Sequence, residues 1–365
     1  MRRPRFRKLG GPARRERLMP KALRYASIAL AVVLLAAATA WWQRPPPMPA
    51  AVLPPYSDAE ALVQARAGAP GAARVLYQQL QRGDLPPERR ARLYAELPHY
   101  PSPRALAFAK ADLTADNLLV RGAALDALAA LVPPAQRGAL LGPLLDDPLQ
   151  SIRYHCARVL LDVSADELGV YFGPLQAVLD DYVKTLEREP ERPESQAELA
   201  RIYRHDGDYQ QASLAIHRVL ARSPDDLQAI VMLAHILDAQ GQPDHARDTL
   251  AQALNRQPDS AFLQHQLGLW LLAHDQEEYA LLALTRAVEL APDDSDYRFA
   301  LASALHGMGQ LQPAQQQLDE LLRRNPADRR ARLVLIEYWK QSGQLQNVQV
   351  LLAELEQQNP DDPAL

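Results

Sequence analysis

The chain has 365 residues, of which 48% are hydrophobic and 23% charged, a composition typical of a folded protein with room for more than one domain. Its net charge of −4 is unevenly distributed, because residues 1–24 carry ten Lys or Arg and one acid, whereas the remaining residues carry 30 bases and 43 acids. Since the positive charge is confined to the first 24 residues, the body is not expected to bind nucleic acid. The single cysteine, Cys156, excludes an internal disulfide, a cysteine-based metal site and covalently attached c-type haem.

The N-terminal segment has the pattern of a membrane anchor. Residues 25–42 form an uncharged run of 18 residues that ends in two tryptophans, and as a helix they would span about 27 Å. The basic residues 1–24 precede this run, so we expect them to form a cytoplasmic tail. The body would then face the periplasm from a bacterial inner membrane, held by one transmembrane helix. The alternatives are a nucleic-acid-binding arm and a cleaved signal peptide, for which Ala38-Thr39-Ala40 is a passable site.

A proline-rich linker and a helical region are expected next. Residues 43–57 contain six prolines, which predict a stiff, extended spacer. Residues 58–170 repeat loosely, because residues 117–128 align with residues 149–160 at a shift of 32. The alignment pairs Arg121 with Arg153 and Ala124 with Cys156, so we expect Cys156 to be a small buried residue and not a nucleophile. This segment resembles HEAT-type helical hairpins, and residues 171–192 are expected to form a connecting helix.

A strict 34-residue period governs residues 193–362, which divide into five consecutive units. Position 32 of each unit is a proline: Pro224, Pro258, Pro292, Pro326 and Pro360. Position 15 is a glycine in four units and an aspartate in the third: Gly207, Gly241, Asp275, Gly309 and Gly343. Apolar residues at positions 7, 8 and 11 form one helical stripe, and those at positions 20, 24 and 27 form a second. Each unit is therefore predicted to be a helix–turn–helix hairpin that buries its apolar face against its neighbours.

Local signals set the expected limits of these helices. Glycine at position 15 reaches positive φ without steric cost, and the proline at position 32 ends the second helix. The aspartate that follows three of the prolines is expected to cap the next helix: Asp225, Asp259 and Asp293. The five units resemble tetratricopeptide repeats, although position 4, where that family most often has Trp, is apolar only at Ile230. We therefore expect weaker packing at that position.

A second resemblance concerns the whole body. Helical hairpins joined directly to tetratricopeptide units, in a sequence rich in Ala, Leu and Arg, are similar to the C-terminal halves of periplasmic multihaem c-type cytochromes. The haem-binding half of those proteins has no counterpart here. The resemblance implies a related scaffold, with a place in the assembly of a membrane or respiratory, cytochrome-related complex.

The resemblance to tetratricopeptide repeats implies a partner-binding groove lined by positions 2, 5, 9, 12 and 13 of the first helix of each unit. The middle units place apolar and aromatic residues and histidines there: Val231, His235, Phe262, His265, Leu269, Leu272, Phe299 and His306. The end units place mostly charged residues there: Arg201, Arg204 and His205 in the first unit, and Arg330, Glu337 and Lys340 in the fifth. An apolar stripe that the core does not need suggests a protein or peptide partner.

The sequence predicts no enzyme, metal site or cofactor. It contains no glycine-rich phosphate loop, no His-Glu-x-x-His and no Gly-x-Ser-x-Gly motif. The function we expect is that of a membrane-anchored scaffold that binds a protein or peptide in the groove. The alternatives are a structural protein that self-associates through an open C-terminal end and, less favoured, a component of an electron-transfer enzyme. The groove could also be filled by the chain's own residues 58–170.

Overall fold

A computed structural model describes residues 57–365, which lie within one compact unit, Pro54–Leu365. Within this part the chain is helical and has no β-strand, so the prediction of an all-helical fold is confirmed there. The expected basic tail 1–24, the transmembrane helix 25–42 and most of the linker 43–57 lie outside the described residues. No helix between residues 57 and 365 is both long enough and apolar enough to span a bilayer.

The first half of the described chain is a series of short helices. They are α2 (Asp58–Arg66), α3 (Ala72–Leu80), α4 (Pro87–Glu96), α5 (Pro103–Asp112), α6 (Leu118–Leu131), α7 (Pro134–Leu141), α8 (Gln150–Leu160), α9 (Ala165–Leu168) and α10 (Phe172–Leu186). Three 3₁₀ turns link some of them: η1 (Leu97–His99), η2 (Gly142–Asp146) and η3 (Gly169–Tyr171). Prolines open α4, α5 and α7, where the missing N–H costs no hydrogen bond.

The two arginines that the 32-residue shift aligned converge on one turn. Arg121 is buried, forms an ion pair with the Asp147 carboxylate and donates to the carbonyl of Leu113 at 2.7 Å. Arg153 donates to the carbonyl of Asp147 at 2.8 Å. Cys156 is fully buried and its thiol donates to the carbonyl of Leu141 at 3.2 Å. Burial raises the pKa of Cys156 to about 12, so the thiolate needed for nucleophilic chemistry is disfavoured.

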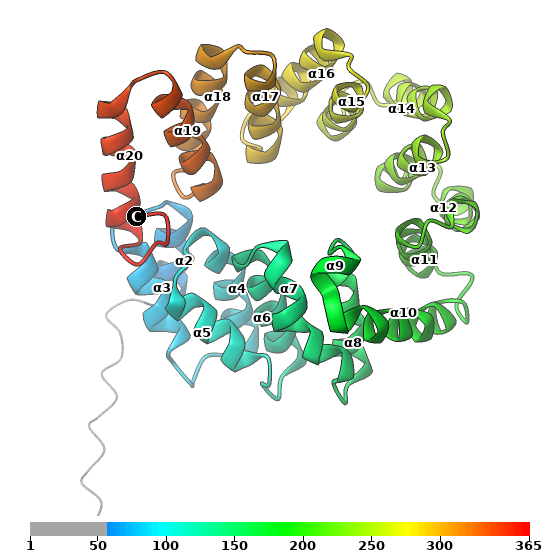
Figure 1. Cartoon of the computed structure of the whole chain (residues 1–365), viewed down its shortest axis with the longest axis horizontal. Helices are drawn as coiled ribbons and strands as arrows, with labels where there is room; N and C mark the ends of the chain where they lie inside the picture. The colour runs from blue at the N-terminus through cyan, green and yellow to red at the C-terminus, as the bar shows by residue number, and fades with distance from the viewer. Residues whose placement is uncertain (1–56) are drawn as a thin grey trace, which may run out of the picture. The chain divides into compact units, whose positions relative to one another are not determined.

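The second half repeats with a period of 34 residues. Its helices are α11 (Pro193–His205), α12 (Tyr209–Arg222), α13 (Leu227–Ala239), α14 (Pro243–Arg256), α15 (Ala261–Ala273), α16 (Glu277–Leu290), α17 (Ser295–Gly307), α18 (Leu311–Arg324), α19 (Arg329–Gln341) and α20 (Leu345–Gln358). Every first helix begins 34 residues after the previous one, and so does every second helix. Among these ten helices, the odd-numbered ones lie on the inner side of the curved chain and the even-numbered ones lie on the outer side (Figure 1).

The turn inside each unit is left-handed. The four glycines at position 15 have φ between 72° and 76°, and Asp275 takes the same conformation at φ 56°. A side chain at such a φ carries a steric cost that glycine avoids. The turn glycines of the sequence therefore act as expected, and the third unit adopts the same turn with an aspartate.

Position 4 departs from the expectation of weak packing. Its polar side chains are buried at Gln196, Arg298 and Arg332 and form hydrogen bonds. Arg298 donates to the carbonyl of Pro292 at 3.1 Å, and Arg332 donates to that of Pro326 at 2.6 Å. The guanidinium group thus bonds the proline that ends the preceding unit, so it replaces an apolar contact by a buried hydrogen bond between neighbouring units.

The N-caps of the first helices lie one residue after the predicted positions. The N-caps of α13, α17 and α19 are Asp226, Asp294 and Asp328, and the N-cap of α15 is Ser260. Assigning this role to Asp225, Asp259 and Asp293 was wrong, because the helix begins two residues after these positions and not one. These three carboxylates instead form exposed ion pairs with arginines of the next unit: Asp225 with Arg256 at 3.7 Å, Asp259 with Arg286 at 3.1 Å and Asp293 with Arg324 at 2.5 Å.

Three apolar clusters follow one another along the described chain. The first runs from Ala61 in α2 to Ile236 in α13, the second from α13 to α16, and the third from Leu284 in α16 to Leu351 in α20. Leu220 and Leu237 pack against both the first and the second cluster, and Leu272 packs against both the second and the third. Apolar packing is therefore continuous from α2 to α20.

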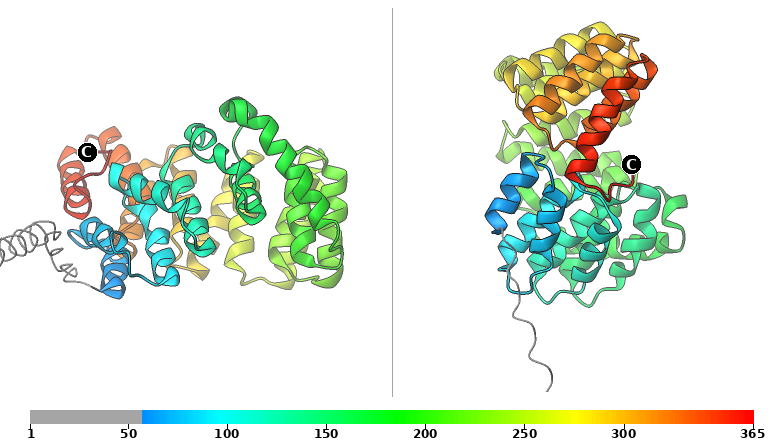
Figure 2. Two further views of the ribbon diagram at one scale, coloured as in Figure 1. Left: turned by 90° about the horizontal axis from the view of Figure 1, so that it is seen from below. Right: turned by 90° about the vertical axis from the view of Figure 1, so that its left-hand side faces the viewer.

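The two ends of this stack meet and close a ring (Figures 1 and 2). The amide of Gly71 donates to the carbonyl of Gln357 at 2.7 Å, and the side-chain amide of Asn359 donates to the carbonyl of Pro101 at 2.8 Å. We call this contact between residues 68–71 and 100–101 on one side and residues 326–327 and 357–362 on the other the seam. The C-terminal end is therefore covered by the chain's own first helices, and the expectation of an open end was wrong.

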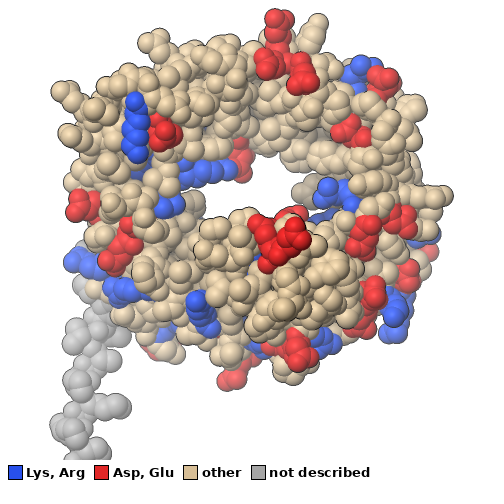
Figure 3. All heavy atoms as spheres, viewed as in Figure 1, with Lys and Arg blue, Asp and Glu red and all other residues tan. Residues whose placement is uncertain are grey.

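The backbones of the two sides touch at the seam. A Cβ atom added to Gly68 would lie 2.7 Å from the carbonyl carbon and oxygen of Pro326 and 2.9 Å from the amide nitrogen of Ala327. Such distances leave no room for a side chain, so Gly68 is required for this approach as well as for its own φ of 58°. Inside the ring, side chains leave an opening that passes through its centre (Figure 3).

The left-handed turns predict opposite effects of two substitutions. Gly241→Ala should lower the free energy of unfolding by about 1–2 kcal/mol, because alanine is strained at φ 74° although its Cβ would meet no atom within 4 Å. Asp275→Gly should raise the free energy of unfolding by up to about 1 kcal/mol by relieving the same strain. Urea denaturation followed by circular dichroism measures both. A stabilising Gly241→Ala would contradict this account of the turn.

Candidate functional site

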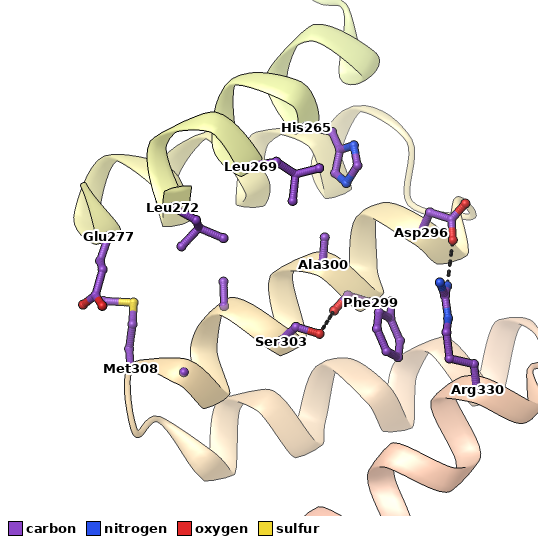
Figure 4. Close-up of a pocket in the computed structure, with 12 residues that line it drawn as sticks. His265, Leu269, Leu272, Glu277, Asp296, Phe299, Ala300, Ser303, Met308 and Arg330 are labelled. Atoms are coloured by element: carbon purple, nitrogen blue, oxygen red, sulfur yellow. Dashed lines mark hydrogen bonds and ion pairs between the residues drawn. The ribbon is translucent and has the colours of Figure 1, made fainter. Parts of the chain in front are cut away.

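The inner side of the five units carries a pocket lined mainly by α15 and α17. Its volume is about 640 Å³, and it is lined by His265, Leu269, Leu272, Glu277, Asp296, Phe299, Ala300, Ser303, Ala304, Gly307, Met308 and Arg330. Leu269 and Leu272 point from α15 toward α17 (Figure 4). The pocket therefore lies between the first helices of the third and fourth units, with α19 of the fifth unit closing one end.

Apolar side chains form the walls of the pocket. Leu269 is 40% exposed, a large fraction for a leucine on the inner side of a packed stack. Leu272 and Phe299 are half-buried, since one side of each packs against the apolar clusters while the other faces the pocket. Burying such surface under a ligand is favourable by about 25 cal/mol per Å². The pocket thus offers apolar contact area that the fold leaves unused.

Charged groups mark the two ends of the pocket. At one end Arg330 pairs with Asp296 at 2.7 Å, and its guanidinium carbon lies 4.0 Å from the centroid of the Phe299 ring. At the other end Glu277 lies beside Met308 (Figure 4). Glu277 forms no ion pair among the residues that the structure describes, so its charge remains available to a ligand. The pocket is therefore apolar along its length, with a neutralised pair at one end and a free carboxylate at the other.

His265 is buried at the edge of the pocket. Its ring packs on that of Tyr297 at a centroid distance of 4.7 Å, and Gln266 lies within hydrogen-bond distance of its Nδ1 at 3.3 Å. Burial lowers the pKa of His265, and the nearby carboxylates of Asp294 and Asp296 oppose that shift. The neutral imidazole is thus favoured in the folded chain, and the ring acts as part of the apolar wall.

Five of the predicted groove residues meet in this pocket: His265, Leu269, Leu272, Phe299 and Arg330. Val231 does not belong to the groove, because its side chain is buried in the second apolar cluster. Phe262 is half-buried against the same cluster. His306 stacks on Tyr338 at a centroid distance of 4.0 Å, and its Nε2 lies 3.0 Å from the side-chain oxygen of Gln341.

The remaining predicted residues lie elsewhere on the inner helices. Arg201 lines a separate polar hollow of about 500 Å³ that α6, α7 and α8 also line, and it pairs with Glu198 at 3.6 Å. Four are exposed on α11, α13 and α19: Arg204, His205, His235 and Glu337. Lys340 is also exposed and pairs with Glu337 at 3.9 Å. The structure therefore does not gather the fourteen predicted residues into one continuous site.

The predicted groove did not include several residues that line the pocket. Asp296, Ser303 and Gly307 occupy positions 2, 9 and 13 of the fourth unit, so the groove positions themselves could have identified them. They were passed over because they are neither large nor apolar. Glu277 and Met308 lie outside those positions and carry no comparable signal.

Comparisons with known proteins bear on the second half of the chain. Residues 204–267 match the tetratricopeptide repeat family. This segment therefore carries the tetratricopeptide repeat pattern. The matched residues run from the end of α11 into α15, slightly less than two of the 34-residue periods. The comparison with curated proteins finds no match.

Three solved structures match about half of this chain. The protein TTC0263, a thermophilic tetratricopeptide protein from Thermus thermophilus, is 26% identical; the match covers 46% of this chain and 91% of that one, with a TM-score of 0.39. The MamA protein is 20% identical over 47% of this chain and 92% of its own, with a TM-score of 0.37. YrrB, described as a tetratricopeptide protein with an unusual peptide-binding site, is 20% identical over 50% and 94%, with a TM-score of 0.34.

The buried His265 predicts a pH dependence of stability. Its pKa is lowered in the folded chain, whereas a histidine in the unfolded chain has a pKa of about 6.5. As the pH falls below that value the unfolded chain takes up the proton first, so the free energy of unfolding falls until the pH reaches the lowered pKa. Urea denaturation at pH 7.5 and 5.5 should show a smaller loss for His265→Gln than for the wild type. An equal loss would place the pH dependence on other groups.

Proposed function

We propose that this chain is a non-catalytic scaffold that binds a protein or peptide through the pocket between α15 and α17. The observation that carries the proposal is the apolar wall on the inner side of the repeats, formed by the exposed Leu269 and the half-buried Leu272 and Phe299. A peptide side chain could bury itself there without any change in the core. The match of residues 204–267 to tetratricopeptide repeats supports this use of the inner surface.

The chemistry of the pocket favours one kind of segment. An aliphatic or aromatic side chain would fill the space between the two helices. Glu277, which has no ion-pair partner in the described part of the chain, would favour a Lys or Arg next to that side chain. The Arg330–Asp296 pair at the other end is exposed and would contribute little net charge. The favoured partner is thus an apolar segment flanked by a basic residue.

We further propose that residues 25–42 anchor the scaffold in a bacterial inner membrane, with the repeats on the periplasmic side. The support is the basic segment 1–24 before an uncharged run that ends in Trp41 and Trp42. A scaffold held in this way would collect its partner at the membrane surface. Its partners would then be subunits of a membrane or respiratory, cytochrome-related complex during assembly.

The pocket predicts a specific loss of binding. Leu269→Asp should weaken the capture of partners by about tenfold or more, because one buried aliphatic side chain contributes about 1.5–3 kcal/mol. Crosslinked pull-down of the full chain with quantitative mass spectrometry measures the loss. Leu282→Asp is the matched control, since Leu282 is also exposed but lines a different hollow, between α14 and α16. Equal capture by the wild type and both variants would remove the pocket from the function.

The membrane anchor predicts how the protein fractionates. The full chain should stay with the membrane pellet after extraction at alkaline pH, whereas a chain lacking residues 1–44 should become soluble. Mass spectrometry of the intact protein distinguishes the cleaved alternative, which gives a mature chain that begins at Trp41. Release of the full chain by alkali, or a mature N-terminus at Trp41, would contradict the anchor.

A further inference from the structure

The seam differs from every other contact around the ring. Elsewhere the apolar clusters are linked by leucines that they share, as described above. Across the seam, no described residue belongs to both the cluster that begins in α2 and the cluster that ends in α20. Among the described residues, two hydrogen bonds cross it, from Gly71 to Gln357 and from Asn359 to Pro101, beside the close approach of Gly68 to the backbone of Pro326.

Hydrogen bonds within the N-terminal side of the seam hold its helices together. The Tyr77 hydroxyl donates to the carbonyl of Tyr100 at 2.6 Å, and the Tyr100 hydroxyl donates to the carbonyl of Ala65 at 2.5 Å. Ser102 donates to the Tyr77 hydroxyl at 2.9 Å. These buried bonds tie α2, α3 and the start of α5 together without any help from the last unit.

An ion pair and hydrogen bonds within the C-terminal side hold that side together as well. Arg329 forms a two-bond ion pair with Asp362, at 2.7 and 2.8 Å, and the Asp362 side chain is fully buried. The side-chain amide of Gln358 donates to the carbonyl of Pro326 at 3.2 Å, and Arg332 donates to the same oxygen. Both sides would therefore keep their form if the seam separated.

We propose that the ring opens at the seam, and that this opening admits internal segments of a partner to the pocket on the inner side. A closed ring can be threaded only by a free chain end. A segment with a folded domain on each side needs an interruption in the ring to be enclosed by it. The seam supplies that interruption because its separation breaks two hydrogen bonds and divides none of the three apolar clusters. The second part of this inference rests on the proposed function, and the first does not.

Glycine substitutions on either side of one turn test the opening. In Gly68→Ala the new Cβ collides with Pro326 across the seam, so this variant should favour the open ring. Gly71→Ala is the matched control, because it also places alanine at a positive φ, of 77°, but its Cβ would meet no atom within 4 Å. The two variants share the strain in the turn and differ in the collision.

The distance across the seam is the measurement. Spin labels on Arg74→Cys in α3 and Glu356→Cys in α20 of the full chain report it, and Cys156 is too deeply buried to be labelled. Double electron–electron resonance should show one short population in wild type and Gly71→Ala and an added long population in Gly68→Ala. A second pair, on Arg222 and Arg256, should stay unchanged in all three. A single short distance in Gly68→Ala, or a longer distance in the second pair, would overturn the proposal.

A crosslink across the seam tests the link to binding. The same two cysteines are joined by a bis-maleimide before the partner is added. The test ligand is the segment that the pull-down recovers, with ubiquitin fused to each of its ends. The crosslinked ring should not bind this ligand. The same segment with free ends should still bind the crosslinked ring. Binding of the ubiquitin-flanked segment to the crosslinked ring would overturn the role of the seam in access. If Leu269→Asp leaves capture unchanged, the proposed function fails, whereas the distance measurement still decides whether the ring opens.

Discussion

Each hairpin of this chain has an apolar face that it cannot bury alone, and this constraint determines the rest of the structure. The left-handed turn at position 15 connects the two helices of a unit, and in the first four units alanine or glycine at positions 8 and 20 lets them approach. The next unit packs on this one with the same turn and the same helix contacts. Because every unit contributes the same step, the path of the stack follows from one repeated geometry.

Polar contacts between units complement this apolar packing. Arg298 and Arg332 are buried and bond the carbonyl of the proline that ends the previous unit, so a proline that stops a helix also offers an acceptor to its neighbour. A buried guanidinium left without that acceptor would carry a large desolvation cost. The exposed pairs formed by Asp225, Asp259 and Asp293 add little by comparison.

The sequence was informative wherever a signal was local and repeated. The prolines and the residues at position 15 located the hairpins, and the groove positions identified five residues of the pocket. The caps were misplaced by one residue because Asp225 and Asp226 are chemically alike and both follow the proline. Val231 was assigned to the groove although it is buried, because an apolar valine fits a groove position and a core position equally well.

The closure of the ring had no comparable signal. It depends on contacts such as that between Asn359 and Pro101, which lie 258 residues apart. A glycine such as Gly68 reads in the sequence as an ordinary turn residue, and nothing local indicates that another backbone occupies the place of its side chain. Meeting of the two ends is a property of the accumulated path through all the helices. A pattern read one unit at a time does not contain it.

Closure also changes how this chain can vary. An open stack of repeats can usually gain or lose a unit at little cost, because each unit contacts only its neighbours. Here an added or deleted block of 34 residues would carry Pro326 and Asn359 away from Gly68 and Pro101, so the ends would no longer meet. The number of repeats is therefore fixed by geometry, and related chains that keep the ring should differ by substitution and not by whole repeats.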